Sequence, residues 1–265
     1  NTNLTIQTTF SRDFLIGDSL VKCSNSKEKV GSVGDNSNQN AMQKILSDSW
    51  YTKLLSISNF ESEIYRNQEF FMSLYPNGKY ITKFLSKLID LNNEFRIIKP
   101  YIVIFPGASF YKRMWPIEKF VILIRELLLT FNGEIVICGS KSEINLCKSL
   151  ESKINNSRIK NFAGKTSLLE FTEIIRRSKL LISNETSAVH IAATVNVQSI
   201  CILGGGHYER FIPYPKNSNL KVPIPVIKKM KCFKCEWKCS LDHSEENPFP
   251  CIELIDSEEI LKIAN

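Results

Sequence analysis

The second part of the chain alternates short strand-like runs with amphipathic segments, and this alternation limits the possible folds more than any other feature. The run YIVIF (Tyr101–Phe105) lies between two prolines and has no charged position, which is typical of a strand buried on both faces of a sheet. Four further strand-like runs, EIVICG, RIKNFAG, KLLIS and QSICILG, begin at residues 134, 158, 179 and 198. Segments with helical spacing separate the runs, so we predict a parallel, doubly wound α/β sheet.

Capping signals mark the helices between these runs. Pro116 stands at the start of an apolar-periodic segment, and proline is favoured in the first turn of a helix. Ser167 is followed three residues later by Glu170, a spacing that predicts a capping box at the start of a helix. Helical spacing over residues 142–153 and 186–195 predicts two further helices.

The first 97 residues carry weaker signals. Residues 4–10 alternate like a strand, residues 29–38 indicate a strand end and a Gly/Asn loop, and residues 62–74 and 80–91 have helical spacing. This pattern predicts the later portion of an α/β layer rather than a complete domain. We therefore expect two domains, an incomplete N-terminal one over residues 1–97 and a C-terminal one over residues 98–265.

The charge balance indicates an anionic ligand but not a nucleic acid. The 265-residue chain has 34 Lys and Arg residues against 27 Asp and Glu residues, a net charge of +7. The excess is spread out, without a basic block interleaved with aromatic residues, so it suits an anionic small molecule or membrane surface. No apolar run reaches about 18 residues and the first residues lack an apolar signal region. We therefore expect a cytoplasmic location and no transmembrane helix.

Residues suited to binding a phosphate follow the ends of the first two predicted strands. In a doubly wound sheet, ligands bind beyond the carboxyl ends of the strands, where helix N-termini meet. The stretch PGASFYKRMWP offers the hydroxyl of Ser109 and the cation of Lys112 or Arg113, although a plain loop before a helix has a similar composition. Glu143 follows the second strand, where its carboxylate either accepts from a ribose diol or complements the helix dipole.

The stretch SNETSAVHIAA follows the fourth strand-like run and begins a helix with Glu185, Thr186 and Ser187. Thr186 is positioned to offer its hydroxyl and backbone N–H to a phosphate. His190 either faces the same end of the sheet or packs as a core histidine. The last run ends in LGGGHYERF, whose three glycines allow a close turn beside the same crevice, but which matches neither a Walker loop nor a dinucleotide fingerprint.

Four of the eight cysteines lie within 20 residues, with the spacing C-x2-C-x3-C-x11-C. The absence of a secretory signal favours metal over disulfide, although disulfides and free thiols stay open as alternatives. The segment 228–251 is rich in Lys, Glu, Asn and Pro, so a structural ion would offset its cost of ordering. Zinc is the default and iron is compatible, and His243 could replace one thiol. The predicted ligands are Cys232, Cys235, Cys239 and Cys251.

Several of these motifs together resemble a known family. PGASFYKRMWPIEKF, ICGSKSE, FAGKTSLLEFTEIIRRSKLLISNETSAVHIAA and ILGGG, in this order and spacing, resemble the second domain of glycosyltransferase family 9, the bacterial heptosyltransferases of lipopolysaccharide synthesis and their relatives. The resemblance covers about residues 98–215, and KVGSVGDNSNQN and YRNQEFFMSL more weakly resemble the late part of the family's first domain. It implies a GT-B fold of two Rossmann-like domains facing a cleft, with the first domain incomplete in this chain.

The resemblance also implies a set of nucleotide-sugar contacts. Ser109 and Lys112 or Arg113 match the family's phosphate-binding hydroxyl and cation, and Glu143 matches an acid near the ribose. Residues 164–168 match the segment that lines the base. Thr186 and His190 match the Asp-Thr-Gly-x-x-His motif, from which Glu185 and Ser187 depart. The implied site is Ser109, Lys112, Arg113, Glu143, Gly164, Thr166, Glu185, Thr186, Ser187 and His190.

The function implied by the resemblance is an inverting glycosyltransferase that needs no catalytic metal. Its donor would be a nucleotide-diphosphate sugar, ADP-heptose by resemblance, and its acceptor lipopolysaccharide, another lipid-linked surface glycan or a protein. Such an acceptor would bring the enzyme to the cytoplasmic face of the inner membrane. Asp18 in LIGDSL only superficially resembles the family's Gly-Asp turn, so we expect the catalytic base in an N-terminal part that this chain lacks.

Two other functions stay open at this stage. The departures at Glu185 and Ser187 suit a binding module with a metal knuckle and a degenerate nucleotide site. A sugar-nucleotide epimerase of the same two-domain shape is the other alternative.

Some autotransporter heptosyltransferases that resemble this family carry a four-Cys iron site near the position of the Cys cluster, which favours the iron option.

Overall fold

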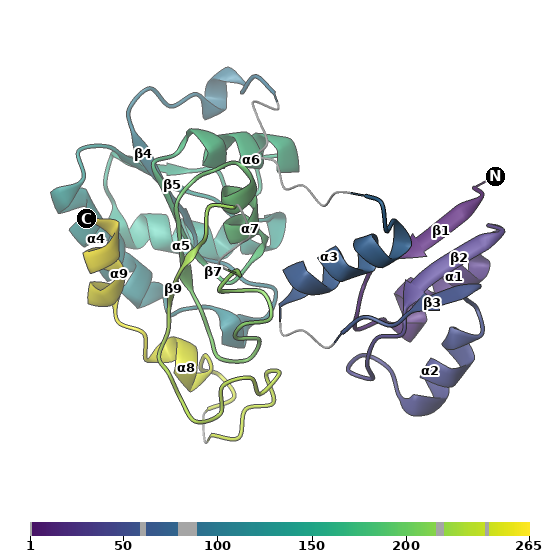
Figure 1. Cartoon of the computed structure of the whole chain (residues 1–265). Coiled ribbons are helices and arrows are strands. Elements are labelled where there is room, and N and C mark those ends of the chain that lie inside the picture. The colour runs from purple at the N-terminus through teal and green to yellow at the C-terminus, as the bar shows by residue number, and fades with distance from the viewer. Residues whose placement is uncertain (1, 59–61, 79–88, 216–219, 242–243) are drawn as a thin grey trace. The chain divides into compact units, whose positions relative to one another are not determined.

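The computed structural model describes residues 2–58, 62–78, 89–215, 220–241 and 244–265. The chain divides into two compact units, Asn1–Ile81 (unit 1) and Thr82–Asn265 (unit 2), each built on its own parallel sheet (Figure 1). Within the described residues, the helices lack the combination of length and apolarity that crossing a bilayer requires.

Unit 2 contains the predicted doubly wound sheet, with all of its paired strands parallel. Its order is β6-β5-β4-β7-β8-β9. The chain first builds outward from β4 to β6 and then returns to add β7 on the other side of β4, so the strand order reverses between β4 and β7, where doubly wound sheets bind ligands. The strands are β4 (Tyr101–Phe105), β5 (Glu134–Ile137), β6 (Ile159–Asn161), β7 (Leu180–Asn184), β8 (Ser199–Ile202) and β9 (Ile224–Val226).

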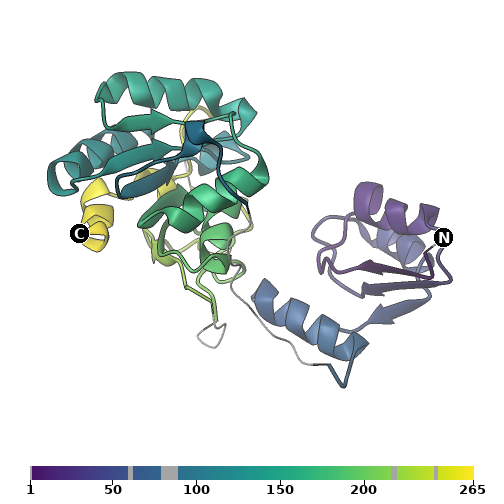
Figure 2. The same ribbon diagram turned by 90° about the horizontal axis from the view of Figure 1, so that it is seen from above.

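Helices cover both faces of this sheet (Figure 2). On one face α4 (Ile117–Thr130) packs against α5 (Ile144–Ile154) and α9 (Ser257–Ala264), and on the other α6 (Leu168–Arg177) packs against α7 (Ser187–Thr194). The predicted capping box begins α6, where the Glu170 N–H donates to the Ser167 hydroxyl and Glu170 accepts from the Ser167 N–H. The shorter elements are α8 (Pro250–Glu253) and helical turns at Asn93–Phe95, Tyr111–Arg113 and Lys141–Glu143.

The core of unit 2 follows from the apolar strand runs. Alternate strand residues such as Ile104, Ile137 and Ile182 face the helices that carry Phe120 and Leu150, and all of these side chains are buried. A sheet with apolar residues on both faces must be covered on both, which is why the runs are continuous rather than alternating. The buried apolar residues hold the sheet together, so the polar loops at the strand ends are not needed for the core and can carry a binding site.

Unit 1 is smaller, with the sheet order β1-β2-β3 and parallel strands. The strand predicted over residues 4–10, the strand end after residue 29 and the helix over 62–74 are confirmed, whereas the helix expected over 80–91 falls largely on residues outside the described part. Its elements are β1 (Leu4–Gln7), a π-helical turn (Phe14–Asp18), α1 (Ser19–Cys23), β2 (Glu28–Ser32), α2 (Ala41–Asp48), β3 (Lys53–Leu55) and α3 (Glu63–Leu74).

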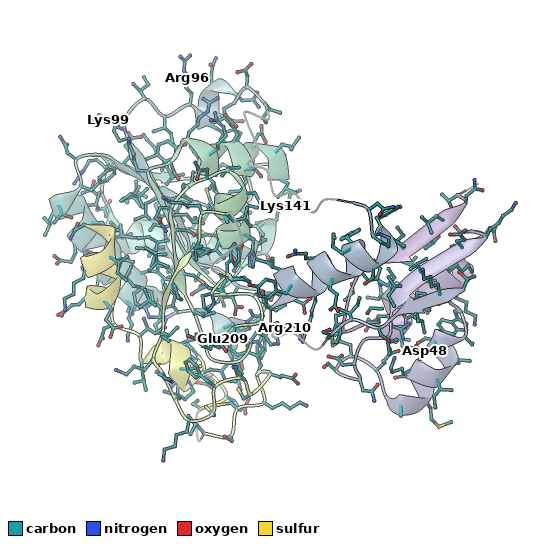
Figure 3. All side chains as sticks on the ribbon, in the orientation of Figure 1. Asp48, Arg96, Lys99, Lys141, Glu209 and Arg210 are labelled. Atoms are coloured by element: carbon teal, nitrogen blue, oxygen red, sulfur yellow. The ribbon has the colours of Figure 1, made fainter. Side chains whose placement is uncertain are left out.

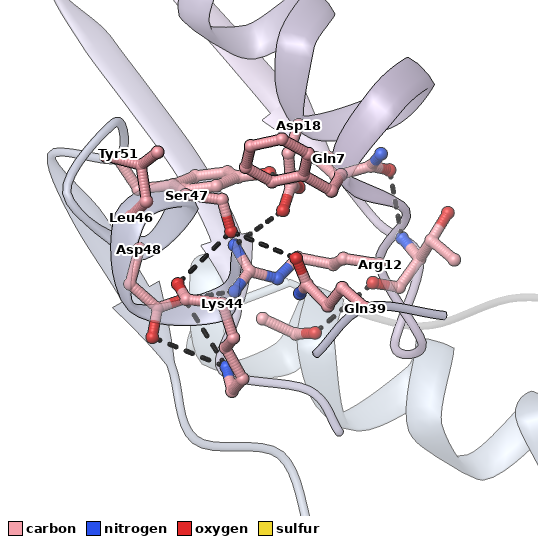
Figure 4. A network of polar contacts seen from close by, with 12 residues as sticks. Gln7, Arg12, Asp18, Gln39, Lys44, Leu46, Ser47, Asp48 and Tyr51 are labelled. Atoms are coloured by element: carbon pink, nitrogen blue, oxygen red, sulfur yellow. Dashed lines mark hydrogen bonds and ion pairs between the residues drawn. The ribbon is translucent and has the colours of Figure 1, made fainter. Parts of the chain in front are cut away.

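A buried polar network lies inside unit 1 (Figure 4). The side chains of Arg12 and Asp18 are both completely buried, and Nη1 of Arg12 lies 3.6 Å from Oδ2 of Asp18. The hydroxyl of Tyr51 donates to Oδ1 of Asp18 over 2.5 Å, and Arg12 also pairs with Asp48. Asp18 therefore lies against a buried guanidinium and is itself enclosed.

Candidate functional site

Asn184 ties together the two loops that meet where the strand order of unit 2 reverses. It ends β7 and is completely buried. Its Nδ2 donates to the carbonyls of Pro106 and Gly107 over 2.6 and 3.2 Å, and its Oδ1 accepts from the backbone N–H of Trp115 over 3.1 Å. One side chain thus holds both ends of the loop 106–115. Its only local signal in the sequence is that of a polar residue directly after the apolar run LLIS.

Arg113 lies at this reversal point and pairs with Glu185 of the following loop. Its Nη2 is 3.2 Å from Oε2 of Glu185, whose side chain is only 7% exposed. Burial raises the pKa of Glu185 to about 7, and the charge of Arg113 opposes this rise. Nε of Arg113 and Oε1 of Glu185 are among the described buried polar atoms without a hydrogen-bond partner. Each side chain of the pair therefore keeps one enclosed polar atom that is not satisfied within the described residues.

Lys112, the other candidate cation, faces a different part of unit 2. Its Nζ lies 2.5 Å from Oε2 of Glu245, and its carbonyl accepts from the backbone N–H of Phe249 over 2.9 Å. The helical turn Tyr111–Arg113 therefore directs two neighbouring cations to different partners. Arg113 contacts the loop after β7, whereas Lys112 contacts residues 228–251, the Cys-rich segment.

Ser109 and Glu143 follow neighbouring strands β4 and β5. Ser109 is exposed, and Glu143 accepts from the backbone N–H of Ser140 over 2.6 Å in a capping box. A Cβ built on Gly107 would lie 1.6 Å from Oε1 of Glu143, so a larger residue at position 107 would have to displace this carboxylate. Glu143 thus takes part in a capping box, and its carboxylate lies against the loop after β4, while its contact with a ribose stays a prediction.

The segment expected to line a nucleotide base lies beside the loop after β5. Gly164 has a φ of +72°, which favours glycine, and its N–H donates to the carbonyl of Gly139 over 2.9 Å. A Cβ at Gly164 would lie 2.6 Å from the side chain of Ile144. Thr166 is half-buried just before the α6 capping box. A cavity of about 290 Å³ opens next to this segment, lined in part by Phe162 and Lys165.

Thr186 and His190 lie on the first two turns of α7. Thr186 is the N-cap and accepts from the N–H of Ala188 over 3.3 Å, and Ser187 is exposed beside it. His190 is half-buried, and its Nδ1 lies 2.6 Å from the hydroxyl of Tyr214, whose ring stacks on the imidazole. Burial lowers the pKa of His190, which favours the neutral imidazole. Tyr214 was not found from the sequence because it lies 24 residues away in an irregular segment.

The three glycines after β8 lie against two aromatic side chains of the Cys-rich segment. A Cβ at Gly204 or Gly206 would lie 2.7 or 2.3 Å from the indole of Trp237, and one at Gly205 would lie 2.3 Å from the ring of Phe233. A turn does follow β8 at these glycines, and its place beside a ligand stays a prediction. The glycines form a flat backbone surface on which the aromatic side chains of the Cys-rich segment rest.

The four clustered cysteines line one small cavity together with Trp237. The backbone N–H of Gly205 donates to Sγ of Cys251 over 3.4 Å, and all eight cysteines of the chain are free thiols rather than disulfides. Among the described residues, which exclude His243, no group of three or more Cys, His, Asp or Glu side chains stands in an arrangement that could hold an ion. The thiols surround a common space without being preassembled, and the metal centre stays a prediction.

The chain is similar in sequence to the heptosyltransferases of one known family. The model of glycosyltransferase family 9 (heptosyltransferase) matches residues 75–242. Lipooligosaccharide heptosyltransferase 2 of Campylobacter jejuni serotype O:2 is 27% identical over 166 residues, which are 60% of this chain and 48% of that protein. The chain therefore spans about half the length of this curated relative.

Two solved structures share the fold. The Escherichia coli ADP-heptose lipopolysaccharide heptosyltransferase II superimposes with a TM-score of 0.68 at 14% identity, covering 99% of this chain and 74% of that one. The iron-containing dodecameric glycosyltransferase TibC of enterotoxigenic E. coli superimposes with a TM-score of 0.53 at 12% identity, covering 99% and 74%. These likenesses show the α/β fold of GT-B glycosyltransferases, as predicted.

Proposed function

Because the chain belongs to glycosyltransferase family 9, we propose that unit 2 binds the diphosphate of a nucleotide sugar where its strand order reverses. The observation that carries the proposal is the juxtaposition of Arg113, Glu185 and the N-terminus of α7 at that point. A cation and unpaired helix N–H groups are the donors that a phosphate requires. Family membership favours this function over a plain binding module or an epimerase.

The reaction we propose is the inverting transfer of a sugar, heptose from ADP-heptose, to a lipopolysaccharide or another surface acceptor. The acceptor hydroxyl displaces the diphosphate at the anomeric carbon, and negative charge develops on the departing phosphate. Arg113 and the first N–H groups of α7, capped by Thr186, are positioned to stabilise that charge, so no catalytic metal is needed. The structural relative named for ADP-heptose supports this choice of donor.

The remaining predicted residues have supporting roles in this proposal. Glu185 and His190 would hydrogen-bond the donor sugar and diphosphate, with His190 held neutral against Tyr214. Glu143, Gly164 and Thr166 lie on adjoining loops that would hold the ribose and base. No residue of the described part is assigned as the base that removes the acceptor proton. A lipid-linked acceptor would place the enzyme at the cytoplasmic face of the inner membrane.

Replacing Arg113 with alanine should weaken ADP binding about 10- to 100-fold, the loss expected for one charge-assisted hydrogen-bond partner. Lys112→Ala is the matched control, because it removes the neighbouring cation, which faces Glu245 instead of the strand ends. Its effect should be smaller than that of Arg113→Ala, because it removes one contact of the turn that carries Arg113 but leaves the guanidinium itself in place. Isothermal titration calorimetry with ADP at pH 8 tests both variants, after thermal melting has shown that they fold. The phosphate assignment would be wrong if Arg113→Ala bound ADP like the unaltered chain.

The donor set of the Cys-rich segment fits a structural ion, which we propose as a second feature of the same unit. Cys232, Cys235, Cys239 and Cys251 line one cavity, and the Gly205 N–H is positioned to stabilise a thiolate on Cys251. These four side chains would hold zinc or iron as thiolates, and the positive charge of the ion would offset the repulsion between them. Iron is favoured by the structural likeness to an iron-containing glycosyltransferase.

Elemental analysis of anaerobically purified protein should find about one zinc or iron ion per chain, the stoichiometry of a four-thiolate site. Cys235→Ser should abolish this stoichiometry and expose segment 228–251 to protease while the sheet of unit 2 persists. Cys23→Ser, which removes an exposed thiol of unit 1, should change neither result. Metal-free protein with paired cysteines in the cluster would contradict the proposal and the cytoplasmic location together.

A further inference from the structure

We propose that Trp237 is a positioning residue that holds the guanidinium of Arg113 in place for the diphosphate, so that the Cys-rich segment sets the affinity of the nucleotide site. This inference rests on the proposed function of Arg113. It concerns residues that no motif of the site connects, because Trp237 lies within the Cys-rich segment, more than 100 positions along the chain from the loop after β4.

The contact itself is a cation–π interaction. Cζ of Arg113 lies 4.6 Å from the centre of the indole of Trp237, inside the range in which a guanidinium is attracted to an aromatic face. Nη2 of Arg113 reaches Glu185 at the same time. The guanidinium is therefore fixed by a ring on its face and by a carboxylate at its edge. Its Nε remains without a partner among the described atoms.

The indole that provides this surface is unusually constrained. Trp237 has a φ of +63°, a conformation that a bulky residue adopts only where its surroundings impose it. Its Nε1 donates to Nδ1 of His207 over 3.1 Å, and its ring stacks on Phe249 with centres 5.5 Å apart. Beneath it are Gly204 and Gly206, where no side chain would fit. A residue held in this way is a fixed platform rather than a mobile cover.

The platform also belongs to the wall of the cysteine cavity. Trp237 lines that cavity, and Cys235 and Cys239 flank it by two positions on either side. Backbone N–H groups of Lys234 and Glu236 donate to the carbonyls of the glycine triplet over 2.7 and 3.0 Å. Lys234 also pairs with Glu209, which is labelled in Figure 3, over 2.6 Å. Whatever orders the cysteines therefore also fixes the ring against Arg113.

The same segment contacts the Arg113 loop at a second point. The Phe249 N–H donates to the carbonyl of Lys112, while Glu245 pairs with the Lys112 ammonium and its carbonyl accepts from the hydroxyl of Tyr111. The turn that carries Arg113 is thus held by contacts of both its backbone and its side chains with this segment. Without the indole, the guanidinium would lose its facial support and turn toward Glu185, which would compete with the diphosphate for its N–H groups.

A set of variants of the full chain tests this role by calorimetry with ADP and by ligand-observed NMR with adenosine, which lacks phosphate. Trp237→Leu keeps apolar bulk over the glycines but removes the π face, and it should lower ADP affinity about 5- to 30-fold, in the range of a desolvated cation–π contact. Adenosine binding should not change. Trp237→Phe keeps an aromatic face, so it should retain most of the ADP affinity of the unaltered chain.

The controls separate positioning from general packing. Phe233→Leu alters an aromatic residue that rests on Gly205 and Tyr208 in the same segment, and it should leave ADP affinity unchanged. In an Arg113→Ala background, Trp237→Leu should cause no further loss. An equal loss in both backgrounds, or an equal loss of adenosine binding, would show that Trp237 only supports the fold. If Arg113→Ala weakens ADP binding and Trp237→Leu does not, the role given to Trp237 is wrong while the phosphate site stands. If Arg113→Ala has no effect, the proposed phosphate site fails first.

Discussion

Replacing Arg12 with methionine is expected to unfold unit 1 while the sheet of unit 2 persists. The guanidinium is completely buried against Asp18, which is itself completely buried and has one oxygen without a hydrogen-bond partner among the described atoms. Removing one member of a buried ion pair costs about 3–5 kcal/mol, because the remaining charge keeps its desolvation penalty. A unit of this size has a free energy of unfolding of about 5 kcal/mol, so the substitution should remove most of it.

Hydrogen exchange measured peptide by peptide would show this result, because it reports on each unit separately. Peptides of β1, β2 and β3 should lose protection, whereas those of β4 and β7 should keep it. Lys22→Met is the matched control: the Lys22 ammonium lies over the ring of Trp50, as the Arg12 guanidinium lies over the ring of Tyr51, but Lys22 is exposed to solvent. The double variant Arg12→Met/Asp18→Asn should recover part of the protection. Full protection of unit 1 in the single variant would mean that the buried ion pair does not stabilise this unit.

Replacing Asn184 with leucine should destabilise unit 2 by at least about 3 kcal/mol and also impair ADP binding. The side chain is completely buried, and its loss leaves the N–H of Trp115 and the carbonyls of Pro106 and Gly107 without their partner. Each buried polar group left unpaired costs about 1–3 kcal/mol. The nucleotide site suffers in addition because the untied loop carries Arg113.

Urea titration followed by near-ultraviolet circular dichroism would report the stability, and calorimetry with ADP the affinity. Asn161→Leu provides a comparison, because Asn161 also ends a strand and makes two hydrogen bonds, with Glu151 and Ala163, but is only half-buried at the sheet edge. It should cost clearly less. Equal costs for the two variants would contradict the view that Asn184 holds the loop by enclosed hydrogen bonds.

The parallel sheet of unit 2 could be predicted from the sequence because its signals are local. Each strand run, the proline before α4 and the Ser167–Glu170 capping box depend on residues within a few positions of each other. β9 was missed for the same reason, since its sequence IPV carries a proline and reads as a breaker. It is tolerated there because an edge strand need not donate every backbone N–H.

The contacts that organise the candidate site are long-range, and the sequence does not show them. Lys112 and Arg113 are adjacent and chemically alike, so only the turn geometry reveals that they face different partners. His190 and Tyr214 meet through tertiary packing, as do Arg113 and Trp237. The glycine triplet illustrates the limit most directly: glycine indicates that something approaches the backbone, but not whether it is a ligand or an indole.

That triplet also constrains how this chain can diverge. Gly204, Gly205 and Gly206 have no room for a methyl group as long as Trp237 and Phe233 lie on them. The two segments must therefore change together during evolution, because a side chain gained in the triplet would displace the aromatics and the cysteines beside them. A homologue that has lost the Cys-rich segment would be released from this constraint. If this contact is kept in relatives, the three glycines and the clustered cysteines should be present together or absent together in their sequences.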